Sequence, residues 1–173
     1  MLETCLRFLC RLFSWIAMAA MAAMALHVTA DVVSKNLLNL PLPVTVEMTA
    51  HYYMVAVVFF PIAAVELRNG HISVEIISQY VSERGRQLLV AAVSLVGAAY
   101  FAIVTARTWG DAVRSFNTGE YLYGSFQLTV WPTRFFIPLG CGLLAAVLVW
   151  KAVMLIRGRG GLLSEGDASM KLD

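Results

Sequence analysis

The chain has 173 residues, of which 60% are hydrophobic and 14% charged, and its formal net charge is +2. A soluble domain usually carries about a quarter charged residues, so this composition excludes a separate soluble catalytic domain. The small net charge, with no basic patch, gives no indication of nucleic-acid binding. The mean hydropathy of +0.73 indicates an integral membrane protein in contact with the lipid bilayer.

Four apolar stretches are each long enough to cross a bilayer, which takes roughly 20 mostly apolar residues. We expect the spans at about residues 12–29, 48–65, 88–106 and 132–156. The predicted fold is an all-α membrane protein. A four-span membrane domain would occupy residues 1–157, followed by a short tail over residues 158–173.

The first apolar stretch has two interpretations. Arg7 and Arg11 precede it and Val28-Thr29-Ala30 follows it, as in a cleavable signal peptide. The apolar run is longer than the 7–15 residues typical of a signal core. We therefore favour a membrane span. In the second span, Pro61 removes one backbone hydrogen bond and predicts a kink.

The segment between the second and third spans, residues 66–87, is more polar. Ile72, Ile76 and Tyr80 recur at helical spacing, while polar side chains occupy the rest of the circumference. This pattern predicts an amphipathic helix that lies flat at the membrane surface.

The loop after the third span carries both charges and aromatic rings. Tyr and Arg are favoured at protein interfaces, so this loop is a candidate partner-binding surface. A plain solvated loop is an equally open interpretation. The candidate residues are Arg107, Asp111, Arg114, Glu120, Tyr121 and Tyr123.

Basic residues divide unevenly between the two sides of the membrane. With the termini and residues 66–87 on one side, that side holds nine basic residues and the other side four. The positive-inside rule then places both termini in the cytoplasm. The nine are Arg7, Arg11, Arg68, Arg84, Arg86, Lys151, Arg157, Arg159 and Lys171, and the four are Lys35, Arg107, Arg114 and Arg134.

The sequence contains only weak candidates for a catalytic, cofactor or metal site. His71 and Glu75 are four residues apart, but two ligands do not make a metal site. His27 and His51 lie at similar depth in the first two spans and could hold a haem between them, as in a small electron-transfer cytochrome b. Hydrogen bonding of each histidine to a neighbour is the simpler interpretation. A stand-alone exporter is disfavoured because the span centres carry almost no ionisable residues.

Several short motifs occur in the order found in one transporter family. They are Pro41-Leu42-Pro43 ahead of Glu47, Gly70-His71-Ile72-x-Val74-Glu75 after the second span, Gly119-Glu120-Tyr121 in the outer loop, and Trp131-Pro132 with Pro138-Leu139-Gly140 in the fourth span. Over roughly residues 7–157 the chain resembles the small permease subunit of tripartite ATP-independent periplasmic (TRAP) transporters, the DctQ-like family. Glu75 stands where the family favours Asp, and Arg134 is more polar than expected.

The resemblance implies a non-catalytic subunit of the bacterial inner membrane. A periplasmic binding protein would deliver an organic acid, and a large multi-span permease subunit would move it with an ion gradient. The small subunit would pack beside the large one as a scaffold. The family motif on the surface helix, Gly70, His71, Ile72, Val74 and Glu75, would then join the outer loop as a partner-binding candidate.

Overall fold

The computed structural model describes residues 2–40, 42, 44–67, 83–122 and 128–157. Within this part of the chain, four helical segments are long and apolar enough to cross a membrane, so that prediction is confirmed. They are Glu3–Leu38, Thr45–Leu67, Gln87–Thr118 and Trp131–Ile156. Most of the expected amphipathic helix and the whole tail from residue 158 lie outside the described residues.

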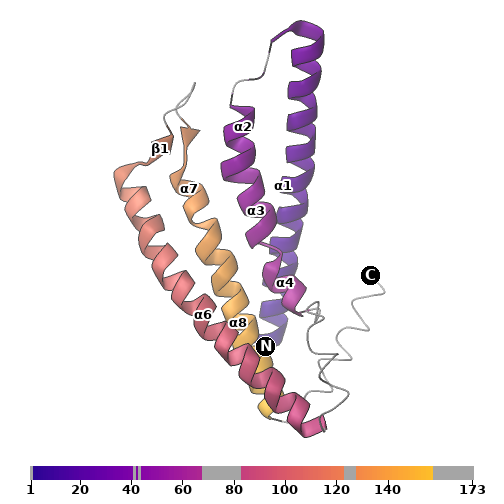
Figure 1. The fold of residues 1–173 in the computed structure, drawn as a ribbon, viewed down its shortest axis with the longest axis vertical. Helices are drawn as coiled ribbons and strands as arrows, with labels where there is room; N and C mark the ends of the chain where they lie inside the picture. Colours follow the sequence, from indigo (N-terminus) through magenta and orange to yellow (C-terminus); the bar gives the residue numbers. More distant parts are fainter. Residues whose placement is uncertain (1, 41, 43, 68–82, 123–127, 158–173) are drawn as a thin grey trace.

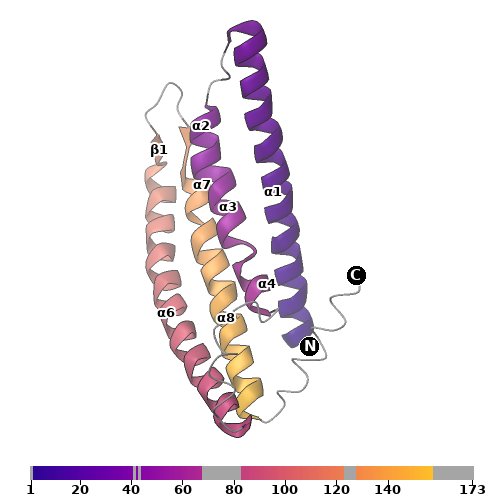
Figure 2. The same cartoon turned by 45° about the vertical axis from the view of Figure 1, so that its right-hand side comes forward.

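The first helix, α1, runs over Leu2–Leu38 without interruption. Its 37 residues extend about 55 Å, well beyond the roughly 30 Å of a hydrocarbon core. In Figures 1 and 2, α1 therefore rises past the start of the next helix. Only 6% of its most apolar window is buried in the molecule, and large side chains such as Trp15 and Leu26 are exposed. We call the end that holds the N-terminus the lower end, and the opposite end the upper end.

The second span consists of four short pieces. They are α2 (Thr45–Met48), the π-helical turn η1 (Thr49–Tyr53), α3 (Met54–Phe59) and α4 (Ile62–Leu67). The break between α3 and α4 falls at Phe60 and Pro61, because proline has no N–H to continue the hydrogen-bond ladder. The interruption expected at Pro61 is therefore present.

The second half of the chain forms a helical hairpin. Helix α6 (Glu83–Thr118) leads into β1 (Tyr121–Leu122), which pairs with β2 (Leu128–Thr129) in antiparallel register. The short helix α7 (Trp131–Arg134) and the long α8 (Phe136–Ile156) return to the lower end. Figure 2 shows the resulting row of helices, with α1 at one edge and α6 at the other.

Helix α8 forms the centre of the molecule. Half of its apolar window is buried, against 17% for the second and third spans. Its contact with α6 involves small buried residues on α6, which let the two backbones approach closely. They are Ala91, Ser94 and Ala98.

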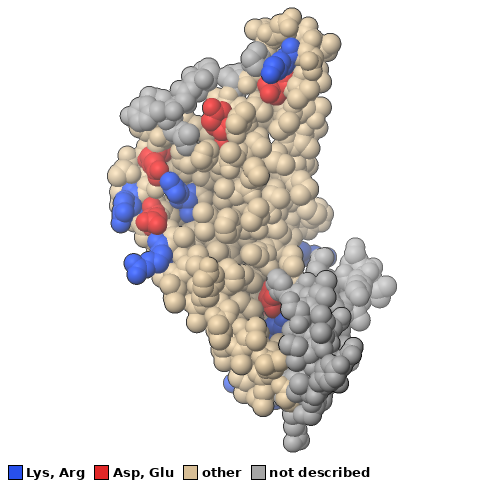
Figure 3. Space-filling model, viewed as in Figure 1, with Lys and Arg blue, Asp and Glu red and all other residues tan. Residues whose placement is uncertain are grey.

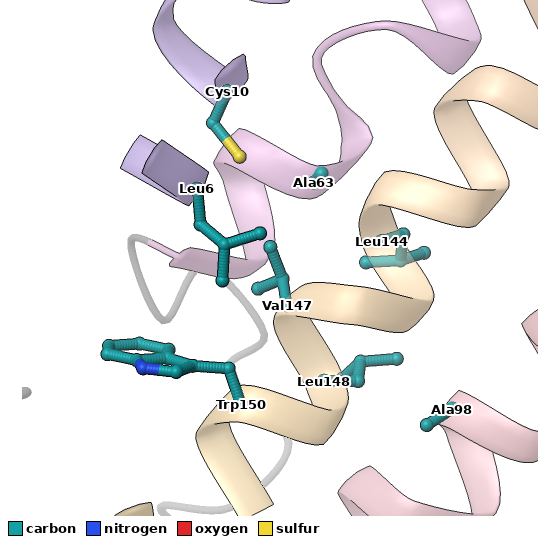
Figure 4. Close-up of a cluster of buried hydrophobic side chains, with 8 residues drawn as sticks. All are labelled: Leu6, Cys10, Ala63, Ala98, Leu144, Val147, Leu148 and Trp150. Atoms are coloured by element: carbon teal, nitrogen blue, oxygen red, sulfur yellow. The ribbon is translucent and has the colours of Figure 1, made fainter. Parts of the chain in front are cut away.

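The lower core gathers side chains from four helices around α8 (Figure 4). Val147 is fully buried and Leu144 and Leu148 lie beside it on the same helix. The other members are Leu6 and Cys10 of α1, Ala63 of α4, Ala98 of α6 and Trp150 of α8. Higher up, the Phe60 ring lies between Phe13 and Phe136, with centroid separations of 5.0 and 4.9 Å. These contacts fix α1 and the second span against α8.

At the kink of the second span, the backbone of Phe59 lies directly against Gly140 of α8. A Cβ atom placed on Gly140 would overlap the Phe59 carbonyl oxygen and lie 3.0 Å from the Phe59 Cβ. The contact therefore requires a residue without a side chain at position 140.

A buried ion pair joins the lower ends of α4 and α8. Lys151 Nζ lies 2.7 Å from Glu66 Oε1, and the two side chains are only 14% and 7% exposed. Each charge neutralises the other in a place where an unpaired charge would be costly. The pair thereby joins the described end of the second span to α8.

Gly140→Ala is expected to destabilise the protein by about 1–3 kcal/mol, the usual cost of overpacking. Gly110→Ala is the matched control, because a Cβ at Gly110 meets nothing within 4 Å and alanine favours a helix by up to about 1 kcal/mol. Thermal unfolding of the detergent-purified variants measures both. Equal melting temperatures for the two variants would contradict the close contact at Phe59.

Lys151→Met is expected to lower stability by about 3 kcal/mol or more, since it leaves the Glu66 carboxylate buried without its ammonium partner. A double-mutant cycle with Glu66→Gln isolates the pair from other effects of each change. Coupling of about 0.5–3 kcal/mol in unfolding free energy is expected. Simple additivity of the two changes would show that the pair does not stabilise the fold.

Candidate interaction site

The predicted partner-binding residues divide into two groups. Gly70, His71, Ile72, Val74 and Glu75 fall in residues 68–82, outside the described part of the chain, as does Tyr123. The remaining residues of the outer loop lie at the upper end of α6 and in the β1–β2 hairpin.

Charged side chains gather at the upper end of α6 and around the hairpin, whereas the middle of the same face is almost free of charge (Figure 3). Arg107, Asp111 and Arg114 are exposed and spaced four and three residues apart, so they share one face of the helix. We call these three residues the α6 stripe. Asp111 Oδ1 lies 4.0 Å from Arg114 Nη1, with both side chains more than 60% exposed. Such a pair contributes little stability, and its charges are available to a partner.

Glu120 occupies a different environment, a hydrogen-bonded cluster with Ser115 and Arg134. The Ser115 hydroxyl donates to one carboxylate oxygen, and Arg134 Nη2 lies 2.9 Å from the other. The Glu120 amide also donates to the Ser115 carbonyl at 3.0 Å, and its carbonyl accepts from the Val130 amide at 3.0 Å. Glu120 therefore ties the hairpin to the end of α6 and to α7.

These hydrogen bonds alter the acidity of Glu120. The Ser115 hydroxyl, and after it the Arg134 guanidinium, hold the pKa of the carboxyl below its ordinary value of 4.5. Because folding lowers this pKa, the interaction stabilises the protein above the carboxyl's unfolded pKa. The contribution is lost as the pH falls through the folded pKa.

Tyr52 and Tyr53, which sequence reasoning did not single out, connect two other parts of the upper end. The Tyr52 hydroxyl donates to the Thr129 carbonyl in β2. Tyr53 Oη lies 3.3 Å from His27 Nδ1 of α1, and the two rings meet edge to face. The π-helical turn η1 thus links α1 to the outer hairpin through consecutive side chains.

The contact between His27 and Tyr53 bears on the haem interpretation of His27 and His51. One ring nitrogen of His27 is already hydrogen-bonded to Tyr53, as the simpler interpretation expects. Among the described residues, no group of three or more His, Cys, Asp or Glu is placed to hold a metal ion. The described site consists of exposed charges on α6 and a hydrogen-bonded hairpin.

Glu120→Gln is expected to reduce the loss of stability between pH 7 and pH 3, because the folded pKa of Glu120 lies below 4.5. The effect should be about 1 kcal/mol or less, because the Glu120 side chain is 39% exposed and solvent screens the pair. Thermal unfolding at the two pH values measures it. Glu47→Gln is the control, since Glu47 makes no hydrogen bond or ion pair with other described residues. An unchanged pH dependence in Glu120→Gln would contradict the cluster's contribution.

Comparison with known proteins now assigns the chain to a family. Residues 24–158 match the family of tripartite ATP-independent periplasmic transporters, DctQ component. Comparisons with curated proteins and with solved structures find no match. The matched region includes the second, third and fourth spans, the α6 stripe and the Glu120 cluster. Because the match covers well over half of the chain, the protein belongs to the DctQ component family of TRAP transporters.

Proposed function

We propose that this chain is a scaffold in the bacterial inner membrane, packed beside the large permease subunit of a TRAP transporter. That subunit would perform ion-gradient-driven uptake of an organic acid brought by a periplasmic binding protein. Family membership supports the role of small transporter subunit. The observation that carries the scaffold role is the position of the charges in the spans.

Ionisable residues avoid the centres of the third and fourth spans. Residues 87–106 and 135–150 contain no Asp, Glu, Lys, Arg or His. Near the ends of the spans, Glu66 pairs with Lys151, and Glu120 with Arg134. A translocation path needs polar or charged groups near the bilayer midplane. A chain with this distribution is suited to hold another subunit in place.

The two edges of the row supply surface for such a partner. Helix α1 buries very little of itself within the molecule, and α6 packs chiefly on α8. Exposed apolar side chains run along α1, including Phe8, Trp15 and Leu26, and along α6, including Val96 and Ile103. In a membrane these faces meet either lipid or helices of another subunit.

The excess of basic residues at the lower end supports an orientation with both termini in the cytoplasm. The α6 stripe and the hairpin would then face the periplasm, where the binding protein arrives. The Glu120 cluster would hold Tyr121 and the hairpin in position beside the stripe. The amphipathic segment with Gly70, His71 and Glu75 would lie at the cytoplasmic surface, against lipid or the large subunit.

Purification of the tagged chain in mild detergent, expressed from its own operon, tests the subunit role. We expect a large multi-span protein to be recovered with it in a constant ratio, and a colourless sample. Recovery of the chain alone with a haem absorbance band would overturn the proposal and favour the electron-transfer interpretation of His27 and His51.

Reversing the positive charges of the α6 stripe tests docking of the binding protein. Arg107→Glu with Arg114→Glu is expected to lower uptake several-fold at limiting binding protein and much less at saturating concentrations, because charge complementarity acts chiefly on association. Lys35→Glu, an exposed basic residue on α1, is the control. Unchanged uptake at limiting binding protein would exclude the stripe as a docking surface.

A further inference from the structure

An apolar groove opens between α6 and α8 in the lower half of the molecule. Ala99 and Ala102 line it on α6, and Ala146 and Val149 line it on α8. Leu6 of α1 and Trp150 of α8, both members of the lower core in Figure 4, also contribute to its walls. The groove has a volume of about 650 Å³ and its lining is almost entirely carbon. Its concave shape follows from the alanines, whose side chains are too short to fill the space.

The groove leads toward a positive charge. On α8 its lining residues Ala146, Val149 and Val153 recur at helical spacing, so they share one face. Arg157 follows about three turns after Ala146 and therefore continues the same face at the lower end. The Arg157 side chain is exposed, and no hydrogen bond or ion pair joins it to another described residue.

In the part of the chain that the structure describes, no acidic side chain pairs with Arg157. At the lower end, Glu3 lies 3.0 Å from Arg7, and Glu66 lies 2.7 Å from Lys151. Within these described residues Arg157 is therefore unpaired at the end of the apolar groove, on the side of the membrane where the N-terminus lies. Basic side chains at such positions attract anionic lipid headgroups.

We propose that the groove binds an anionic phospholipid, with one acyl chain between α6 and α8 and the headgroup phosphate on Arg157. A carbon-lined groove at the depth of the spans makes close apolar contact with an acyl chain. Its lining has almost no polar atoms that could hydrogen-bond to a polar ligand. Arginine binds phosphate through charge-assisted hydrogen bonds. This site does not depend on the proposed transporter role.

The apolar lining and the charge at its lower end favour an anionic lipid over a helix of a partner. The lining of α8 from Ala146 to Val153 extends over two turns, or about 10 Å, along which an acyl chain can lie. A partner helix seated here would also meet the Arg157 charge, which an anionic headgroup neutralises.

Native mass spectrometry of the full chain, reconstituted with equal phosphatidylglycerol and phosphatidylcholine, tests the headgroup contact. The wild-type chain is expected to retain one phosphatidylglycerol with about fivefold preference, the effect of one basic residue near a lipid surface. Arg157→Gln should remove most of that preference, and Lys35→Gln, at the upper end of α1, should not. A preference that survives in Arg157→Gln would overturn the assignment.

A second pair of variants tests the groove itself. Ala99→Leu with Ala146→Leu fills the groove from two exposed positions, and should abolish retention of either lipid while the melting temperature stays near that of the wild type. Ala25→Leu, an exposed position on α1, is the control. Retention unaffected by filling would overturn the proposal. Loss of the large subunit from the filled variant, with lipid still bound, would also overturn the proposal, because that result would assign the groove to a partner helix.

Discussion

The close approach of α8 to its neighbours is the contact on which the rest of the structure depends. In lipid, helices gain no hydrophobic driving force from association, so they are held by packing and hydrogen bonds at short range. Gly140 allows the Phe59 backbone to lie against α8, and the small residues of α6 allow the second close contact. With α8 fixed on both sides, α1 is free to present most of its surface outward.

Polar interactions complete this arrangement at the two ends of the row. The Glu66–Lys151 pair joins the second and fourth spans below, and the Glu120 cluster joins the hairpin to α6 and α7 above. Tyr52 and Tyr53 connect α1 to the same hairpin. These polar contacts thus connect neighbouring spans into one frame, while the charges of the α6 stripe remain exposed. A frame of this kind agrees with the proposal that the chain positions other subunits.

The sequence allowed the four helices to be predicted, because hydrophobic length is set by the bilayer alone. The break at Pro61 was equally predictable from its missing N–H. The π-helical turn was not, since no simple residue pattern marks it. Arg134 looked too polar for its position because its partner, Glu120, lies across a hairpin. Sequence spacing does not reveal how the strands of that hairpin pair. For the same reason Glu120 looked like a free loop charge. The motif around His71 stays a prediction, since it falls outside the described residues.

We propose that this chain holds other subunits in position around a transport path that they form. The most direct measurement is ion-gradient-driven uptake in proteoliposomes that contain the large subunit and the binding protein, with and without this chain. We predict that uptake is lost without the chain and returns when the chain is added back. Uptake should also persist when Glu66 and Lys151 are replaced together by apolar residues that preserve packing. Equal uptake by the large subunit and the binding protein without this chain would contradict the proposal, as would ion-driven transport by this chain in isolation.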